Sequence, residues 1–119
     1  MQLQGMTKHA LQLIQLTEVK MSESKEHRQV ARSLAKKEQT DYNSGKGPDI
    51  LNSRRIIEVE TINTVLGGLQ QLQGYHKPVY IAGTNKAAVD KALEITKNTT
   101  VGVMNRKGNI IKPSTRKRK

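Results

Sequence analysis

The chain has 119 residues, enough for one domain with one hydrophobic core and too few for two domains of ordinary size. It contains no cysteine, which excludes disulfides, a thiolate nucleophile, iron–sulfur clusters and cysteine-ligated zinc. No apolar run reaches the length of a membrane span, and no apolar stretch near the N-terminus resembles a signal peptide. We therefore expect a cytoplasmic protein that does not associate with membranes.

The charge of the chain is strongly positive. Lys and Arg number 21 against ten Asp and Glu, a formal net charge of +11. The C-terminal segment KPSTRKRK holds cations and no acid, and the rest of the chain stays basic without it. This balance indicates a polyanionic partner, with nucleic acid expected first. We divide the chain into a domain over 1–111 and a basic tail over 112–119, which its composition predicts to be disordered until it binds.

The first predicted elements are helical. Residues 8–20 have apolar side chains at irregular spacing, which fits neither a regular helix nor a regular strand, and we assign them as a helix. Ser22 or Ser24 can cap a second helix, in which apolar residues recur every three or four positions up to Glu38. Residues 39–48 carry two glycines and a proline, so we expect a short extended piece at 41–43 followed by a loop.

From Pro48 the pattern becomes that of two strands, PDIL and IIEVET, joined by a tight turn. Side chains alternate across a strand, so Ile57 and Val59 face one side while Glu58 and Glu60 face the other. Two carboxylates side by side repel each other, and burial adds a desolvation cost. A bound cation would offset that cost, whereas a face open to water would leave the pair as a solvated edge.

The second half of the chain predicts a strand, helix, strand unit. A helix over 64–76 precedes a strand at 78–83, a capped helix from Thr84 or Asn85 to Ile95, and a strand at 100–105. Such a unit implies parallel strands with a right-handed crossover. With a last short strand at 109–112, the sequence predicts an α/β fold with a central mixed sheet flanked by helices.

The stretch PDILNSRRIIEVE resembles the PD-(D/E)xK motif of the restriction-endonuclease-like nuclease superfamily, with Asp49 in its first part and Glu58 opening its second. The predicted order of elements matches the αβββαβ core of that superfamily over residues 22–105. The resemblance implies that Asp49 and Glu58 bind Mg²⁺ or Mn²⁺ and that metal-activated water hydrolyses a DNA phosphodiester bond. In this superfamily an acid on the first helix of the core often assists. Glu23 or Glu26, in the predicted helix that ends near Glu38, would supply it here.

This chain departs from the family pattern at one position, because Glu60 replaces the lysine of the motif. Glu60 would act as a general base or as a further metal ligand, whereas a degenerate site would bind DNA without cutting it. Gln71 and Tyr75 form Q-x-x-x-Y, which resembles the RecB-like branch of the same superfamily. That resemblance implies that both lie near the catalytic acids and DNA, on one face of a helix.

Several cations lie in sequence near the acids or at the end of the chain, and we expect them to contact the nucleic-acid backbone. They are Lys46, Arg54, Arg55, Lys77, Arg116, Lys117, Arg118 and Lys119. Arg54 and Arg55 are consecutive, so one of them can face the acids and partly replace the charge of the missing lysine. The three histidines lack metal-ligand spacing and no phosphate-binding glycine motif occurs, so neither a zinc site nor a nucleotide site is expected.

Two functions fit these observations. One is a metal-dependent endonuclease that hydrolyses DNA, acting on branched or broken DNA. The other is a non-catalytic nucleic-acid-binding protein, either a degenerate nuclease or a small basic module of the ribonucleoprotein type. A nuclease with one active site per chain would need a homodimer to cut both strands, and the helix that carries Gly67 and Gly68 is the candidate interface.

Overall fold

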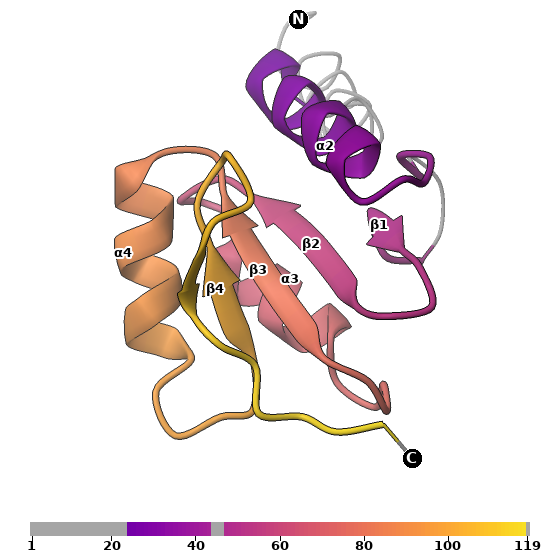
Figure 1. Cartoon of the computed structure of the whole chain (residues 1–119). Helices are drawn as coiled ribbons and strands as arrows, with labels where there is room; N and C mark the ends of the chain where they lie inside the picture. The colour runs from indigo at the N-terminus through magenta and orange to yellow at the C-terminus, as the bar shows by residue number, and fades with distance from the viewer. Residues whose placement is uncertain (1–23, 44–46, 119) are drawn as a thin grey trace, which may run out of the picture.

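The computed structural model describes residues 24–43 and 47–118. The helix expected at 8–20 and the candidate residues Glu23, Lys46 and Lys119 lie outside these described residues. The described chain forms an α/β fold in which helices cover both faces of one mixed sheet (Figure 1). Within these ranges, no helix is long and apolar enough to cross a membrane.

The described helices and strands follow one another in the order that the sequence predicts, with one difference. In order they are α2 (Lys25–Lys37), β1 (Ile50–Leu51), β2 (Ile56–Glu60), α3 (Val65–Gln71), β3 (Val79–Gly83), α4 (Lys86–Ile95), β4 (Gly102–Met104) and β5 (Ile110–Lys112). The short extended piece expected at 41–43 does not form a strand of the sheet, although the Asn43 amide donates to the Asp49 carbonyl over 2.8 Å. The described residues between α2 and α3 therefore hold two strands, and the expected αβββαβ order is corrected to that extent.

The five strands lie in the order β1-β2-β3-β4-β5. The three inner strands β2, β3 and β4 run parallel to one another, and the two edge strands β1 and β5 pair antiparallel with their neighbours. The predicted central mixed sheet and the strand, helix, strand unit from β3 through α4 to β4 are confirmed.

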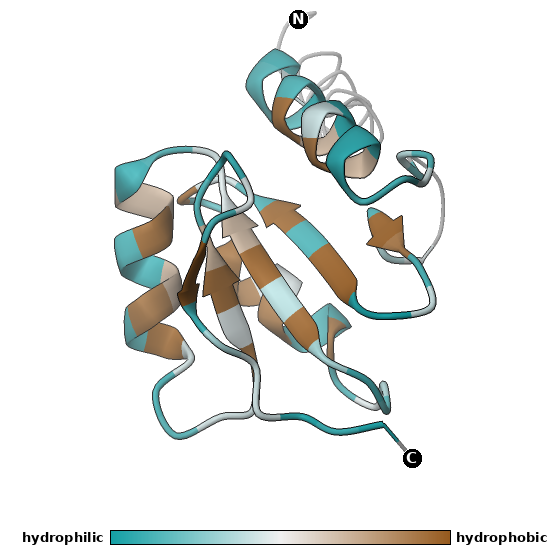
Figure 2. Cartoon of the chain, in the orientation of Figure 1, coloured by the Kyte–Doolittle hydropathy of each residue, from teal (hydrophilic) through white to brown (hydrophobic). Residues whose placement is uncertain are grey.

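The sheet separates two apolar clusters, and Figure 2 shows its strands as mostly hydrophobic bands. On one face, α2 packs Val30 and Leu34 against Ile57 and Val59 of β2. On the other face, α3 and α4 pack against alternate residues of the sheet, including Ile56. Because side chains alternate along β2, Glu58 and Glu60 point to the α3 side.

The helix ends follow from capping and from glycine. The Ser24 side chain accepts from the His27 amide over 3.0 Å, and the Asn85 side chain accepts from the Ala88 amide over 2.9 Å, as the sequence predicts. The helix expected over 64–76 is shorter in the structure, where α3 ends at Gln71. Gly74 beyond it adopts φ of 87°, a left-handed conformation that favours glycine and does not continue a helix.

The basic C-terminal segment lies against the domain through residue 116, which differs from the expected division after residue 111. Lys112 belongs to β5, and its ammonium donates to the Thr96 carbonyl over 2.7 Å. The Ser114 hydroxyl donates to the Thr100 carbonyl over 2.7 Å, and Arg116 Nε donates to the Thr100 hydroxyl over 2.9 Å. These bonds attach the segment to the loop that precedes β4.

Candidate metal centre

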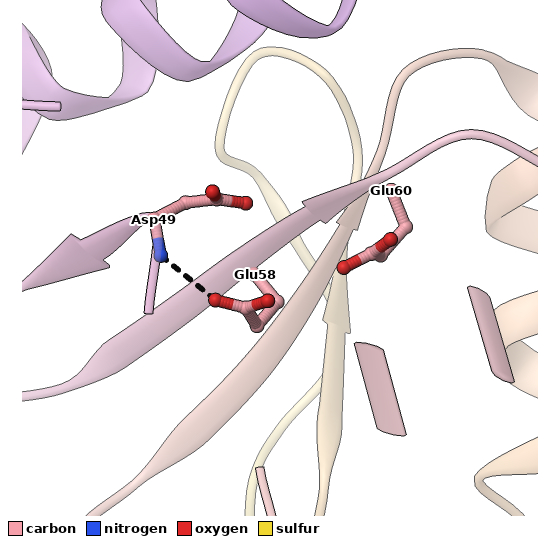
Figure 3. Close-up of side chains that lie close together, drawn as sticks. All are labelled: Asp49, Glu58 and Glu60. Carbon is pink, nitrogen blue, oxygen red and sulfur yellow. Dashed lines mark hydrogen bonds between the residues drawn. The ribbon is translucent and has the colours of Figure 1, made fainter. Parts of the chain in front are cut away.

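Three carboxylates meet beside the paired strands β1 and β2 (Figure 3). Asp49 directly precedes β1, while Glu58 and Glu60 are alternate residues of β2. One oxygen from each side chain lies within 4.8 Å of the other two. The structure thus brings together Asp49 and Glu58, which the motif singles out as metal ligands, and Glu60, which replaces the lysine of the motif.

The short hairpin between β1 and β2 sets this arrangement. Ile50 pairs with Ile57, so Asp49 stands opposite Glu58. The Asp49 amide donates to Glu58 Oε1 over 2.7 Å, and the Val59 amide donates to Asp49 Oδ2 over 2.8 Å. The eight-residue spacing in the motif therefore has a local cause, because it is the length of chain that turns the hairpin and returns to face Asp49.

Burial makes the two glutamates difficult to ionise. Glu58 is 3% exposed and Glu60 is 7% exposed. Desolvation, with a further contribution from the negative charge of Asp49, raises the pKa of Glu58 to about 9. Desolvation likewise raises the pKa of Glu60 to about 7, although a side-chain hydrogen bond with Thr64 opposes the shift. In the absence of a cation, Glu58 therefore holds a proton at neutral pH.

His27 is the site residue that sequence reasoning missed. It lies in the first turn of α2, is 8% exposed, and places Nε2 3.4 Å from Asp49 Oδ2. Glu26, the acid expected to assist from this helix, is instead exposed. The available signal was an imidazole at a position of α2 where the periodicity demands a buried side chain.

Gly68 in α3 makes room for Glu60. A Cβ atom at this position would lie 2.5 Å from Glu60 Oε2 and 2.6 Å from its Cγ, whereas a Cβ at Gly67 would meet nothing within 4 Å. The close packing expected of the two glycines thus occurs at Gly68, against a carboxylate of the same chain. A homodimer through this helix remains a prediction.

Among the described residues, no hydrogen bond or ion pair joins the two arginines of the β1–β2 turn to the three carboxylates, and the role expected of one of them stays a prediction. Arg55 Nε lies 3.1 Å from Glu38 Oε1, and its guanidinium is 5.9 Å from the centre of the Tyr80 ring, so this side chain is directed to the α2 side. Arg54 is exposed, and its amide donates to the Asn52 side chain over 2.8 Å. The expectation that one of the two faces the acids finds no support in these contacts.

Gln71 and Tyr75 do not share a helical face, which corrects the prediction from Q-x-x-x-Y. Gln71 is the exposed last residue of α3, and Tyr75 follows the turn at Gly74. Tyr75 packs against the apolar cluster beneath α3 and α4. Among the described residues, no hydrogen bond or ion pair joins either side chain to the three carboxylates.

The other cations expected to contact nucleic acid divide into two groups. Lys77 and Arg116 are engaged within the fold: the Lys77 ammonium donates to the Asn52 carbonyl over 3.2 Å, and Arg116 donates to the carbonyls of Leu72 and Tyr75. Arg54, Lys117 and Arg118 are exposed and remain free to meet a phosphate backbone. Contact of any of these cations with nucleic acid stays a prediction.

The donor set suits a hard divalent cation. Carboxylate oxygens are the ligands of Mg²⁺ and Ca²⁺, and two oxygens on opposite sides of Mg²⁺ lie about 4.2 Å apart at its usual bond lengths. The oxygens of the three side chains, all within 4.8 Å of one another, lie close to separations of this size. The three carboxylates could therefore hold a metal ion.

No family model matches this chain, and neither does any curated protein or solved structure. Membership of the nuclease superfamily stays a prediction from the motif.

Proposed function

We propose that the protein is a metal-dependent endonuclease that hydrolyses DNA phosphodiester bonds, with a restriction-endonuclease-like fold. The observation that carries the proposal is the cluster of Asp49, Glu58 and Glu60, whose oxygens gather within 4.8 Å although two of the side chains are buried. Burying like charges together costs folding free energy. A divalent cation offsets that cost and gives the cluster a chemical use.

The three carboxylates take different parts in this proposal. Asp49 and Glu58 would hold the metal, and Glu58 would have to be deprotonated to do so. The metal supplies Lewis-acid charge at the phosphate and a site where water is activated. Glu60, with a pKa raised to about 7, is suited either to complete the ligand set or to accept the proton of the attacking water. His27 orients Asp49 from the other side.

The charge of the chain favours a nucleic-acid substrate. A net charge of +11 attracts a polyanion, and the three tyrosines offer little surface for stacking bases. Recognition through the phosphate backbone suits an enzyme that reads the shape of DNA, so we propose branched or broken DNA as the substrate class.

Cleavage of a supercoiled plasmid and of a labelled four-way junction, with Mg²⁺ or Mn²⁺ and with EDTA, tests this function. We compare the wild-type protein with Asp49→Asn and with Asp90→Asn, which removes an exposed carboxylate on α4 as a matched control. Changes to groups around a metal site cost about 10- to 100-fold in activity, so loss of a ligand should cost at least about 100-fold. Wild-type and Asp90→Asn proteins should cut, and only with metal.

The alternative function makes the opposite prediction. If no protein cuts with either metal, and Asp49→Asn leaves salt-sensitive DNA binding unchanged, the chain is a non-catalytic nucleic-acid-binding protein. Cutting of RNA in place of DNA would keep the chemistry and change the substrate.

A further inference from the structure

The solvent face of α2 carries a continuous row of cations, which we name the α2 basic face. Its members are Lys25, Arg28, Arg32 and Lys36. They follow one another at intervals of three, four and four residues, which places them on one side of a helix. The row lies away from the buried side of α2, where Val30 and Leu34 meet the sheet. At 1.5 Å per residue it extends for about 16 Å.

The composition of this face differs from that of an ordinary solvated helix. Exposed helices commonly pair opposite charges four residues apart, as α4 does through Lys86 and Asp90, whose charged atoms are 2.8 Å apart. On the α2 basic face, the exposed Arg32 instead stands four residues before the exposed Lys36. Like charges at this spacing destabilise a helix, so this pair does not help α2 to form.

Two further cations lie near the C-terminal end of α2. The Lys37 ammonium donates to the Lys107 carbonyl over 2.9 Å, which brings the turn between β4 and β5 against the helix. That turn carries Arg106 and Lys107, both exposed. The acid at this end of α2, Glu38, is buried and paired with Arg55, so it does not offset the charge of Arg106 and Lys107.

We propose that the α2 basic face, with Arg106 and Lys107, binds the phosphate backbone of double-stranded DNA. The row presents successive cations to an array with one phosphate per about 3.4 Å of each strand. The same helix places His27 3.4 Å from Asp49, so DNA held along α2 lies against the element that borders the metal centre. The role in cleavage rests on the proposed function, whereas the binding itself requires neither metal nor catalysis.

Salt-dependent binding of a fluorescent DNA duplex, measured by anisotropy in EDTA, tests the proposal with two variants of equal net charge. The first replaces three exposed cations of α2: Lys25→Gln, Arg32→Gln and Lys36→Gln. The second replaces three lysines on and after α4: Lys86→Gln, Lys91→Gln and Lys97→Gln. Each phosphate contact adds about 0.9 to the slope of log affinity against log salt. The α2 variant should lower that slope by about 2.7, and the α4 variant by less than about 1.

If the slope falls equally in both variants, or does not fall in the α2 variant, the proposal is overturned. A third protein with Lys25→Arg, Arg32→Lys and Lys36→Arg keeps the charge and should bind as the wild type does; loss of binding in it would also contradict a backbone contact. The outcome is separate from that of the cleavage assay, because a protein that fails to cut can still show the α2 effect.

Discussion

Glu58 holds a proton in an environment that a metal ion would change. Its pKa is raised to about 9 from an ordinary value of 4.5, so the unfolded chain ionises this group at a lower pH than the folded one does. The contribution of Glu58 to the free energy of unfolding is therefore fully present below about pH 4.5 and is lost as the pH rises through about 9. The contribution of Glu60 is lost in the same way, and this loss ends near its own pKa of about 7.

The substitution Glu58→Gln tests this dependence of the free energy of unfolding on pH. Glutamine keeps the oxygen that accepts from the Asp49 amide and stays neutral at every pH. In EDTA, the free energy of unfolding of the variant should exceed that of the wild type by an amount that grows between about pH 4.5 and pH 9. Urea denaturation across that range measures the difference. Glu94→Gln, at an exposed position of α4, serves as control and should show a constant difference.

A difference between Glu58→Gln and wild type that stays flat with pH would mean that Glu58 is ionised in the folded protein. The carboxylates would then be compensated by charges within the chain, and the physical reason for a metal would be removed.

Residues related by local geometry were predictable from the sequence, and those related by packing were not. Alternation along one strand and a short hairpin are enough to bring Glu58 and Glu60 to Asp49. The contact between His27 and Asp49 depends on the angle at which α2 crosses the sheet, which no local pattern encodes. Arg55 turns to Glu38 for the same reason, because its partner lies on another element.

At the scale of elements, replacing each of the two glycines of α3 by alanine should have opposite effects on the stability of the fold. Gly67→Ala should raise the free energy of unfolding by about 0.5–1 kcal/mol, because alanine favours the helix and the position is open. Gly68→Ala should lower it by about 1–3 kcal/mol, because the new methyl group meets the Glu60 side chain. Urea denaturation of both variants gives the comparison.

The same two substitutions also test whether α3 positions Glu60 at the metal centre. Gly68→Ala displaces Glu60 and should weaken Mn²⁺ binding, whereas Gly67→Ala should leave it unchanged. If Gly68→Ala is as stable as Gly67→Ala and binds Mn²⁺ equally well, α3 does not position Glu60.

The ends of the elements were harder to predict than their existence. Alternating and three-to-four-residue periodicity indicated β2, β3 and both capped helices, and the structure has them. The early end of α3 depends on Gly74, whose left-handed conformation the sequence permits without requiring it. The attachment of the basic C-terminal segment depends on Arg116, whose carbonyl partners at Leu72 and Tyr75 are remote in sequence.

For the whole molecule, positive surface charge and the buried acidic cluster should have opposite effects on the affinity for DNA. The long-range attraction comes from a net charge of +11, and the negative charge that remains on the carboxylate cluster opposes it when no metal is present. Asp49→Asn should therefore bind a DNA duplex in EDTA at least as tightly as the wild type does, while it loses cleavage. Anisotropy at several salt concentrations measures the affinity, with Asp90→Asn as the charge-matched control.

Weaker binding by Asp49→Asn than by Asp90→Asn would show that Asp49 supports the binding surface itself. The residue would then have a structural role in holding the β1–β2 hairpin through the Val59 amide, and loss of cleavage in this variant would carry less meaning.

The most direct test of the metal centre is a calorimetric titration of Mn²⁺ into the wild-type, Asp49→Asn and Asp90→Asn proteins. The carboxylate cluster predicts one class of site in the wild type and in Asp90→Asn, with affinity that rises with pH as Glu58 releases its proton, and no such site in Asp49→Asn. Absence of Mn²⁺ binding in the wild type, or equal binding in Asp49→Asn, would contradict a metal centre at these carboxylates and with it the proposed nuclease.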